Sequence, residues 1–416
     1  MGKNIVIVGG GIVGLSCAYY LQKEGHQVTV FDKSNMSAGA SYVNAGYITP
    51  SHIVPMAAPG MISTGIKYMF NTASPFYMKP RLDIDFLKWA WYFKKSSTAA
   101  KVEKAIPVIK DINILSRQLF QEIKDSGDLG NFHLERKGLL MLYQTQKECD
   151  HEMAVAAKAK FLGLEVNQLD MTEIKKLEPN IQINALGAIH YECDAHMTPS
   201  DFMTRMKTFL QGAGVKLKHN EEVIDIKLIS DKLVKVKTSK GELKADTIVL
   251  AAGSWTSKLS KQLHISLPLQ AGKGYRINVK RKTGICMPAI LMESKMAVTP
   301  MKGFTRFAGT MEFSGINNKI RKERVDAIAK GASKYYEGLQ ITKEEKNDVR
   351  CGLRPVSPDG LPYIGAADQH HAIVFATGHA MMGWSLGPAT GKLVSELITK
   401  RKTSLDLLPF HPQRRF

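Results

Sequence analysis

The stretch KNIVIVGGGIVGLSCAYYLQKEGHQVTVFD, residues 3–32, decides the fold. It begins with an apolar, β-branched run that is typical of a buried parallel strand. Glycines at the G-x-G-x-x-G spacing follow, and residues 15–24 then carry apolar positions at helical spacing. A second apolar run, residues 26–31, predicts another strand that ends at Asp32. This order of strand, glycines, helix, strand and acid predicts a βαβ unit that binds a dinucleotide.

The three glycines of this unit have separate expected roles. Gly9 permits the tight turn, Gly11 lets the backbone approach a pyrophosphate, and Gly14 lets the helix pack on the strand. The unpaired N–H groups at the start of the helix favour phosphate there. We expect Asp32 to accept hydrogen bonds from a ribose hydroxyl, and its charge argues against NADP. The motif alone does not distinguish NAD from FAD.

The composition is that of a globular protein with a basic surface. The 416 residues are 44% hydrophobic and 23% charged, which allows two domains with cores of their own. The formal net charge of +19 favours an anionic partner, such as a substrate, a lipid headgroup or a nucleic acid. The basic residues are scattered and form no arginine-rich helix, so no nucleic-acid partner is expected.

Cysteine usage and apolar runs indicate the compartment. The five cysteines are scattered without a C-x-x-C pair, which suits a reducing compartment and argues against a disulfide scaffold or a zinc ribbon. No metal site is expected. The apolar run after Met1 leads straight into the glycines, so it predicts a strand and not a signal peptide. No stretch reaches the ~18 apolar residues of a membrane span. We therefore expect a cytoplasmic protein.

Residues 86–95, FLKWAWYFKK, combine aromatic side chains with lysines at their end. Two interpretations remain open. The segment is either a helix buried against the second domain, or a patch that rests on the inner membrane surface with its lysines on the headgroups.

The nucleotide domain is expected to be discontinuous. Residues 247–253, TIVLAAG, are a fully apolar run that predicts a buried strand beside the first one. Residues 373–376 predict another, and Thr377 to Trp384 then turn into a helix that runs to Ile398, whose N-terminus could hold an anion. The expected domains are 1–50, 198–270 and 347–410 for nucleotide binding, and 51–197 and 271–346 for an inserted substrate-binding domain.

A second landmark is CGLRPVSPDGLP, residues 351–362, in which proline and glycine predict a shaped loop. It contains Arg354. A guanidinium pairs with a carboxylate in planar, bidentate fashion, so an arginine within such a frame is a candidate carboxylate-binding residue.

Together these landmarks resemble the FAD-dependent D-amino-acid oxidase and dehydrogenase superfamily, and most of all its bacterial D-amino-acid dehydrogenases. The segments that carry the resemblance, besides the N-terminal glycines, are SYVNAG at 41–46, AAPG at 57–60, AAGS at 251–254, KGY at 273–275, GLRP at 352–355, PDG at 358–360, TGH at 377–379 and GW at 383–384. The resemblance implies an α/β fold with a Rossmann-like FAD-binding domain and an inserted α+β substrate domain, whose antiparallel sheet covers the flavin. It implies FAD bound non-covalently, because no cysteine follows Gly378.

The resemblance also assigns cofactor contacts residue by residue. It places Gly9, Gly11, Ile12, Val13, Gly14, Asp32 and Lys33 at the pyrophosphate and ribose, Ala40, Ser41, Asn44, Ala45 and Gly46 along the ribityl chain and flavin, Val223 at the adenine, and Ala251, Gly253, Gly378, His379, Met381, Met382, Gly383 and Trp384 among the remaining contacts. The turn at 378–384 would point helix N–H groups at the pyrimidine end of the flavin and stabilise its reduced form. His379 would lie beside the flavin without a catalytic role.

For the substrate, the resemblance implies that Arg354 binds the carboxylate. Family oxidases often use a tyrosine as a second contact, but the corresponding segment SKMA, residues 294–297, has none, so Tyr275 is the candidate. The implied reaction is oxidative deamination of a D-amino acid to the imino acid and 2-oxo acid by hydride transfer to flavin N5. A cyclic substrate such as D-proline or cis-4-hydroxy-D-proline fits the same scheme, with a quinone or O₂ as electron acceptor.

Three alternatives remain at this point. A glycine- or sarcosine-type amine oxidase has the same fold. A flavin-dependent tRNA-modifying protein would use the basic surface, and a non-catalytic flavin-fold binding protein would not need Arg354.

Overall fold

The opening segment forms the centre of a parallel sheet. In the computed structural model, which describes residues 2–60, 76–79, 81–230 and 232–416, strand β1 (Asn4–Val8) is followed by helix α1 (Ile12–Lys23) and strand β2 (Gln27–Phe31). Strand β1 pairs in parallel with β2 on one side and with β14 (Thr247–Leu250) on the other. The predicted βαβ unit is confirmed, and so is the neighbouring strand predicted from residues 247–253.

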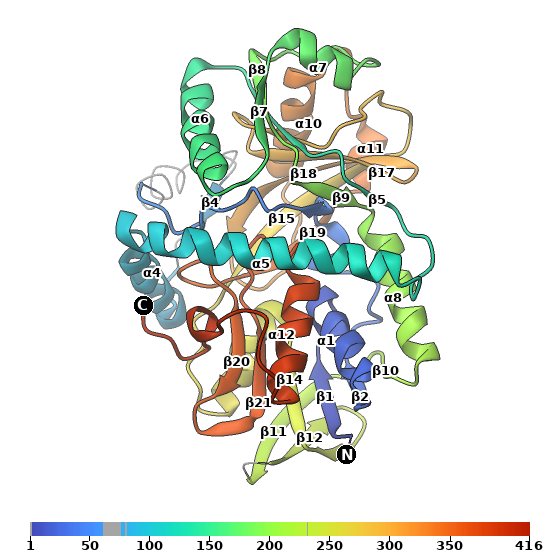
Figure 1. Ribbon diagram of the computed structural model, residues 1–416, viewed down its shortest axis with the longest axis vertical. Helices are drawn as coiled ribbons and strands as arrows, with labels where there is room; N and C mark the ends of the chain where they lie inside the picture. The colour runs from blue at the N-terminus through green and yellow to red at the C-terminus, as the bar shows by residue number, and fades with distance from the viewer. Residues whose placement is uncertain (1, 61–75, 80, 231) are drawn as a thin grey trace.

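The sheet around β1 has six strands in the order β10-β2-β1-β14-β21-β20. The outer strands are β10 (Lys216–Lys218), β21 (His370–Thr377) and β20 (Tyr363–Ala367), of which β20 is antiparallel to β21. Helix α1 packs closely on α12 (Gly387–Ile398) and on α8 (Pro199–Gly212). This sheet occupies the lower half of the molecule in Figure 1, and its strands come from the beginning, middle and end of the chain.

A nine-stranded sheet forms the upper half (Figure 1). Its order is β19-β15-β18-β17-β16-β6-β8-β7, with β4 paired to β18. The strands are β4 (Phe76–Met78), β6 (Leu139–Tyr143), β7 (Val166–Leu169), β8 (Gly187–Tyr191), β15 (Gln270–Val279), β16 (Ala289–Leu291), β17 (Met296–Met301), β18 (Phe304–Phe313) and β19 (Arg350–Val356). The pairs β16–β6 and β18–β4 are parallel and the rest antiparallel, so the predicted antiparallel sheet is in fact mixed. The predicted α/β class holds.

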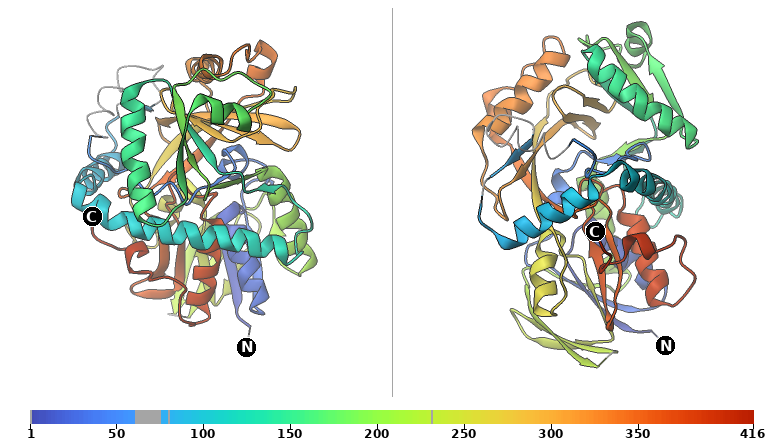
Figure 2. Two further views of the ribbon diagram at one scale, coloured as in Figure 1. Left: turned by 45° about the horizontal axis from the view of Figure 1, so that its top comes forward. Right: turned by 90° about the vertical axis from the view of Figure 1, so that its left-hand side faces the viewer.

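Helices flank both sheets. The long helix α5 (Ala99–Asp125) crosses the front of the molecule between the two halves and contacts α12 (Figure 1). In the second view of Figure 2, α6 (Gln146–Phe161) and α10 (Lys322–Tyr335) lie at opposite sides of the upper half. The remaining α-helices among the described residues are α2 (Ala40–Val43), α4 (Ile84–Ser96), α7 (Met171–Leu177), α9 (Thr256–Gln262) and α11 (Lys343–Asn347).

Two small sheets complete the fold. The first joins β3 (Tyr47–Ile48), β9 (Ala195–Met197) and β5 (Leu134–Glu135), and the second joins β11 (Val223–Ser230), β12 (Leu233–Thr238) and β13 (Glu242–Ala245). Strand β3 directly follows residues 41–46, so the first small sheet anchors the end of that segment.

The loop predicted for residues 351–362 is wrong over its first half. Residues 350–356 form β19, which pairs with β15 over its whole length and extends the large sheet. Proline predicted a loop here, but proline is also tolerated in the edge strand of a sheet. Strand β19 is such an edge strand, so Pro355 needs no N–H group to pair with a further strand. The Pro355 carbonyl oxygen accepts a hydrogen bond from Ala380 N at 2.8 Å.

The turn predicted for residues 377–384 is followed by the predicted helix, α12, which ends at Ile398 as expected. Gly378 and Ala380 have positive φ angles of 78° and 48°, which no helix accommodates, and α12 starts only at Gly387. The start of α12 lies against α1, because a Cβ on Gly387 would meet the Ile12 side chain at 2.6 Å. The anion site predicted at this helix N-terminus stays a prediction.

The aromatic segment at 86–95 is a helix with two different faces. Phe86, Trp89 and Phe93 of α4 are buried, which agrees with the predicted packing helix. Leu87 and Trp91, on the other face, are 54% and 55% exposed. Among the described residues, no helix combines the length and the apolar character that crossing a membrane requires.

Gly14 sets the distance between α1 and the turn before it. A Cβ at this position would lie 1.9 Å from the Gly9 carbonyl oxygen, which is backbone and cannot move aside. We expect Gly14→Ala to lower the free energy of unfolding by about 2–3 kcal/mol, the usual cost of overpacking. Urea unfolding of the apoprotein measures this loss.

Gly212 supplies the matched control. It is the last residue of α8, and an added Cβ meets nothing within 4 Å. We expect Gly212→Ala to leave stability unchanged or to raise it by up to ~1 kcal/mol. An equal loss of unfolding free energy in both variants would contradict the packing role of Gly14.

Candidate active site

The two sheets meet at a cavity of about 610 Å³. On one side lie the carboxyl ends of β1, β2, β14 and β21, which is the edge where open α/β sheets bind ligands. On the other side lie β15 and β19 of the large sheet. The predicted residues that line it are Gly9, Gly11, Ile12, Val13, Asp32, Lys33, Ala40, Ser41, Asn44, Val223, Ala251, Gly253, Arg354, His379, Met381, Gly383 and Trp384.

The turn before α1 presents backbone to this cavity. A Cβ on Gly11 would meet the Ser41 hydroxyl at 3.2 Å, and that hydroxyl accepts a hydrogen bond from Ile12 N at 2.9 Å. The first turn of α1 carries no acidic side chain. A helix N-terminus without an opposing carboxylate on its own first turn suits a bound phosphate group.

Asp32 is held in a fixed orientation at the end of β2. One carboxylate oxygen accepts from Gly10 N, and the other accepts from the backbone N and the hydroxyl of Ser34, all at 2.7 Å. An ionised carboxylate offers about four acceptor positions. The remaining one is available to a ribose hydroxyl, as the sequence predicted for this residue.

The end of the cavity near β11 carries a cation over an aromatic ring. The Lys33 ammonium lies 3.7 Å from the centre of the Trp255 ring, and burial lowers the pKa of this lysine. Glu222, Trp255 and Lys258 line the same region beside Val223. Lys33 and Val223 were predicted from the sequence, whereas Glu222, Trp255 and Lys258 were not; only the neighbouring AAGS segment, residues 251–254, offered a signal.

An arginine that the sequence analysis missed fixes the segment 41–46. The Arg306 guanidinium, on β18, donates to the carbonyl oxygens of Tyr42 and Asn44 at 2.9 and 2.7 Å. Burial lowers the pKa of Arg306 to about 9, so it remains charged at neutral pH. The Thr299 hydroxyl donates to Ala45 O at 2.8 Å. The large sheet thus holds the loop that the resemblance places beside the flavin.

Arg354 extends along β15 from the edge strand. Its guanidinium donates to the carbonyl oxygen of Thr310 at 2.9 Å and crosses over Gly274, where a Cβ would lie 2.4 Å from both terminal nitrogens. Burial lowers the pKa of Arg354 to about 10, so it stays cationic at neutral pH. Within the described parts of the chain it has no carboxylate partner, since burial alone shifts its pKa. It is a charge that a ligand can neutralise.

The Thr310 carbonyl group that accepts from Arg354 lies in a β-bulge of β18, which sets its direction. The register between β15 and β18 shifts between Lys273 and Tyr275, and Thr310, in the bulge opposite, has a φ of 67°. A left-handed β-branched residue is strained, and such bulges occur next to active sites because they redirect groups out of the ladder. This bulge has no recognisable signal in the sequence around Thr310.

His379 faces the cavity but is neutral. Its Nε2 lies 2.8 Å from the Thr390 hydroxyl, and burial lowers its pKa to about 3. An imidazole that is neutral throughout the physiological range and already hydrogen-bonded is a packing group. This agrees with the expectation that it has no acid–base role.

Several predicted residues do not line the cavity. They are Gly14, Ala45, Gly46, Gly378, Met382 and Tyr275. Gly46 and Gly378 lie against protein instead, since added Cβ atoms would meet Met197 O at 2.2 Å and the Tyr363 ring at 2.6 Å. Tyr275 is 1% exposed, and its hydroxyl donates to Glu312 at 2.7 Å. The structure therefore places this tyrosine in the core and not at the substrate position.

Comparisons with known proteins agree with this geometry. The family model described as FAD dependent oxidoreductase, DAO, matches residues 4–397. This chain belongs to that family. A DAO-family relative from Helicobacter pylori, named D-amino acid dehydrogenase, is 30% identical over 95% of both chains. Another of the same name from Granulibacter bethesdensis is 28% identical over 97% of both.

The fold is likewise that of DAO-family flavoenzymes. The crystal structure of glycine oxidase from Geobacillus kaustophilus superposes with a TM-score of 0.79 at 22% identity, over 100% of this chain and 99% of that one. The protein is therefore an FAD-dependent oxidoreductase with a D-amino-acid-oxidase-like fold. The residues present fit FAD: a glycine turn and helix N-terminus for phosphate, Asp32 for ribose, and an extended cavity reaching Arg354.

Gly274 offers a test of the arginine's placement. In Gly274→Ala the new methyl group displaces the Arg354 guanidinium, a movable side-chain end, while the backbone stays extended. We expect KM for the amino-acid substrate to rise about tenfold, since small misplacements of a positioning group are costly. Bound flavin should be unchanged. Steady-state kinetics and the flavin-to-protein absorbance ratio measure both quantities.

Gly241→Ala is the control, because an added Cβ there meets nothing within 4 Å. An unchanged KM in Gly274→Ala would show that the guanidinium position seen here does not matter for substrate binding.

Proposed function

We propose that this protein oxidises a D-amino acid to the imino acid, which water hydrolyses to the 2-oxo acid. The observation that carries the proposal is Arg354, a cationic side chain in the cavity with no carboxylate partner among the described residues. A substrate carboxylate would complete it with two parallel hydrogen bonds. The names of the two relatives support the D-amino-acid class.

The protein's own part in this reaction is mainly positioning. Arg354 holds the carboxylate, and the Thr310 carbonyl and the space above Gly274 hold Arg354. His379 is held by Thr390 and burial lowers its pKa, so we assign it no proton transfer, and the proposed reaction starts from the uncharged amine of the substrate. FAD, when bound, supplies the hydride acceptor. Orientation and exclusion of water are the main contributions that the cavity makes.

The choice between substrate types needs a panel of amino acids. The purified holoprotein is mixed anaerobically with D- and L-amino acids, with D-proline and cis-4-hydroxy-D-proline, and with glycine and sarcosine. Flavin bleaching by D-amino acids supports the proposal, and fastest bleaching by the cyclic pair would narrow the substrate to that class. Bleaching by glycine or sarcosine alone would favour the small-amine oxidase alternative. No bleaching, with tRNA bound instead, would overturn an amino-acid substrate.

Removal of the guanidinium tests the carboxylate contact. We expect Arg354→Ala to raise KM by at least about tenfold, because a charge-assisted hydrogen bond contributes about 1.5–3 kcal/mol. Arg350→Ala is the matched control, since Arg350 lies on the same strand with its side chain exposed and should leave KM unchanged. An unchanged KM for every amino acid in Arg354→Ala would contradict the assignment.

We further propose that the protein passes its electrons to a quinone at an anionic membrane surface. The exposed face of α4 supports this, because Leu87 and Trp91 are exposed beside Lys88 and Lys94, and the Lys94 ammonium lies 5.9 Å from the Trp91 ring centre. Exposed aromatic and basic side chains on one helix favour an interfacial position. The net charge of +19 adds attraction to anionic lipid.

Vesicle binding tests this second proposal. We expect the holoprotein to sediment with phosphatidylglycerol vesicles and not with phosphatidylcholine vesicles, and Trp91→Ser to weaken binding at least about threefold. Phe161→Ser, which removes another exposed aromatic residue on α6, should not. Equal weakening of vesicle binding by both variants, or no binding to anionic vesicles, would contradict the α4 assignment.

The electron acceptor needs a separate measurement. Readmission of O₂ or of a quinone analogue to the reduced protein identifies which of the two reoxidises the flavin.

A further inference from the structure

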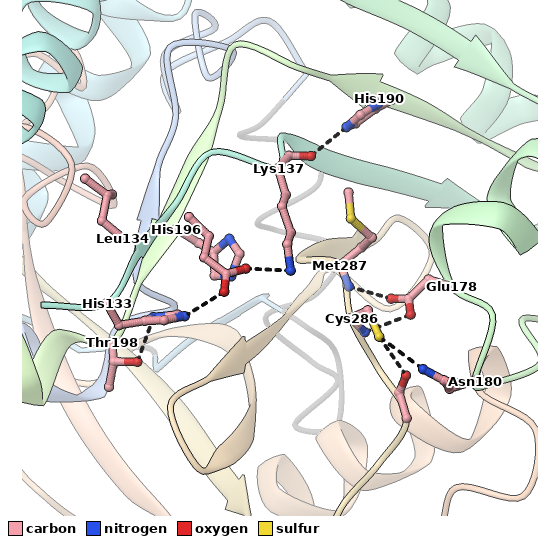
Figure 3. Close-up of polar contacts among 12 residues, drawn as sticks. His133, Leu134, Lys137, Glu178, Asn180, His190, His196, Thr198, Cys286 and Met287 are labelled. Carbon is pink, nitrogen blue, oxygen red and sulfur yellow. Dashed lines mark hydrogen bonds and ion pairs between the residues drawn. The ribbon is translucent and has the colours of Figure 1, made fainter.

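Outside the active site, two histidines and a glutamate gather on the small sheet β3-β9-β5. His133 precedes β5, Glu135 lies in β5, and His196 lies opposite Glu135 in β9. Glu135 Oε1 is 3.2 Å from His133 Nε2, and Glu135 Oε2 is 3.8 Å from His196 Nε2. One ligating atom from each residue lies within 4.8 Å of the others. Figure 3 shows His133 and His196 turned toward the same region.

His196 is the residue of this cluster whose ring nitrogens are least satisfied. Its side chain is fully buried, and neither ring nitrogen has a hydrogen-bond partner of good geometry among the described residues. The backbone of Pro300 lies close enough to the ring to interact with it. Buried polar atoms are nearly always hydrogen-bonded, and an orphaned one often marks a missing ion or water. Nε2 is the nitrogen nearer the carboxylate of Glu135. An ion held between them would satisfy it.

His133 has the support that metal-binding histidines usually have. Its Nδ1 lies 3.1 Å from the Thr198 hydroxyl (Figure 3). That hydroxyl accepts a hydrogen bond from Lys302 N at 2.9 Å. If Nδ1 donates its proton to Thr198, the lone pair of Nε2 faces Glu135. Ligating histidines are typically oriented by a hydrogen bond at the other ring nitrogen.

We propose that His133, Glu135 and His196 form a site for a divalent transition-metal ion such as Zn²⁺. Two imidazoles and one carboxylate are a common ligand set for zinc and for ferrous iron, with positions left open for water. Bonds of about 2.0–2.1 Å place tetrahedral ligand atoms about 3.3 Å apart, so the set needs only a modest contraction. The side chains of His133 and Glu135 can move, since they are 19% and 34% exposed.

Lys137 competes with the ion. Its ammonium lies 2.7 Å from Glu135 Oε2, but the lysine side chain is 48% exposed and can turn into solvent. Binding of the metal therefore replaces one cation by another at the carboxylate. We therefore expect loss of the lysine to strengthen metal binding and loss of a ligand to weaken it.

The ion would connect two segments that are far apart in the sequence and support the cofactor loop from behind. Strand β9 pairs with both β5 and β3, and Met197 N donates to Gly46 O at 2.9 Å. No metal was expected from the sequence, where the scattered cysteines gave no metal-binding pattern, and Glu135 and His196 are 61 residues apart with β6, α6, β7, α7 and β8 between them.

The test is a titration of chelator-treated holoprotein with Co²⁺, followed by competition with Zn²⁺. We expect one equivalent of Co²⁺ to bind and to give visible d–d absorption beyond that of the flavin. His133→Ala and Glu135→Gln should weaken binding by at least about 100-fold, since changes around a metal site already cost 10–100-fold. His151→Ala, on the exposed face of α6, should leave it unchanged.

The Lys137→Ala variant distinguishes a metal-binding site from a cluster that holds only ion pairs. We expect it to tighten Co²⁺ binding by up to about fivefold, on the scale of one exposed ion pair. Flavin absorption and circular dichroism verify that each variant is folded. No uptake of Co²⁺ or Zn²⁺ by the wild type, or equal affinities in wild type, His133→Ala and Glu135→Gln, would overturn the proposal. Amino-acid oxidation does not enter this readout, so the result is independent of the proposed function.

Discussion

The contact between α1 and the glycine turn before it constrains the rest of the molecule. Gly14 lies against the Gly9 carbonyl, and a Cβ on Gly391 of α12 would lie 2.5 Å from the Ser16 backbone. Helix α1 is therefore packed tightly on both the sheet and α12. This packing fixes where the first N–H groups of α1 point, and with them the position of any phosphate bound there.

The side of the cavity that carries Arg354 depends on the large sheet instead. Arg354 comes from the edge strand β19, crosses Gly274 of β15 and ends at the carbonyl of Thr310 in β18. Arg306 of the same sheet holds the loop at 41–46. The two sheets therefore contribute different groups to the cavity: the parallel sheet presents the glycine turn, and the large sheet presents Arg354 and holds the loop at 41–46.

The parts of the structure that follow from local pattern could be predicted from the sequence. The βαβ unit and the buried strand β14 follow from apolar periodicity and glycine spacing, which act over a few residues. The parts that depend on distant pairing could not. Proline and glycine suggested a loop where β19 pairs as an edge strand, and neither the bulge at Thr310 nor the burial of Tyr275 leaves a local signal. Resemblance located Arg354, but only the structure shows what holds it.

The central claim is that Arg354 binds a carboxylate beside the FAD site. The most direct measurement is a crystal structure of the holoprotein with a carboxylate that cannot be oxidised, such as benzoate. The account predicts FAD pyrophosphate at the N-terminus of α1, and the benzoate carboxylate within hydrogen-bond distance of both terminal nitrogens of Arg354. A carboxylate bound elsewhere in the cavity, with Arg354 still directed only at Thr310, would contradict it.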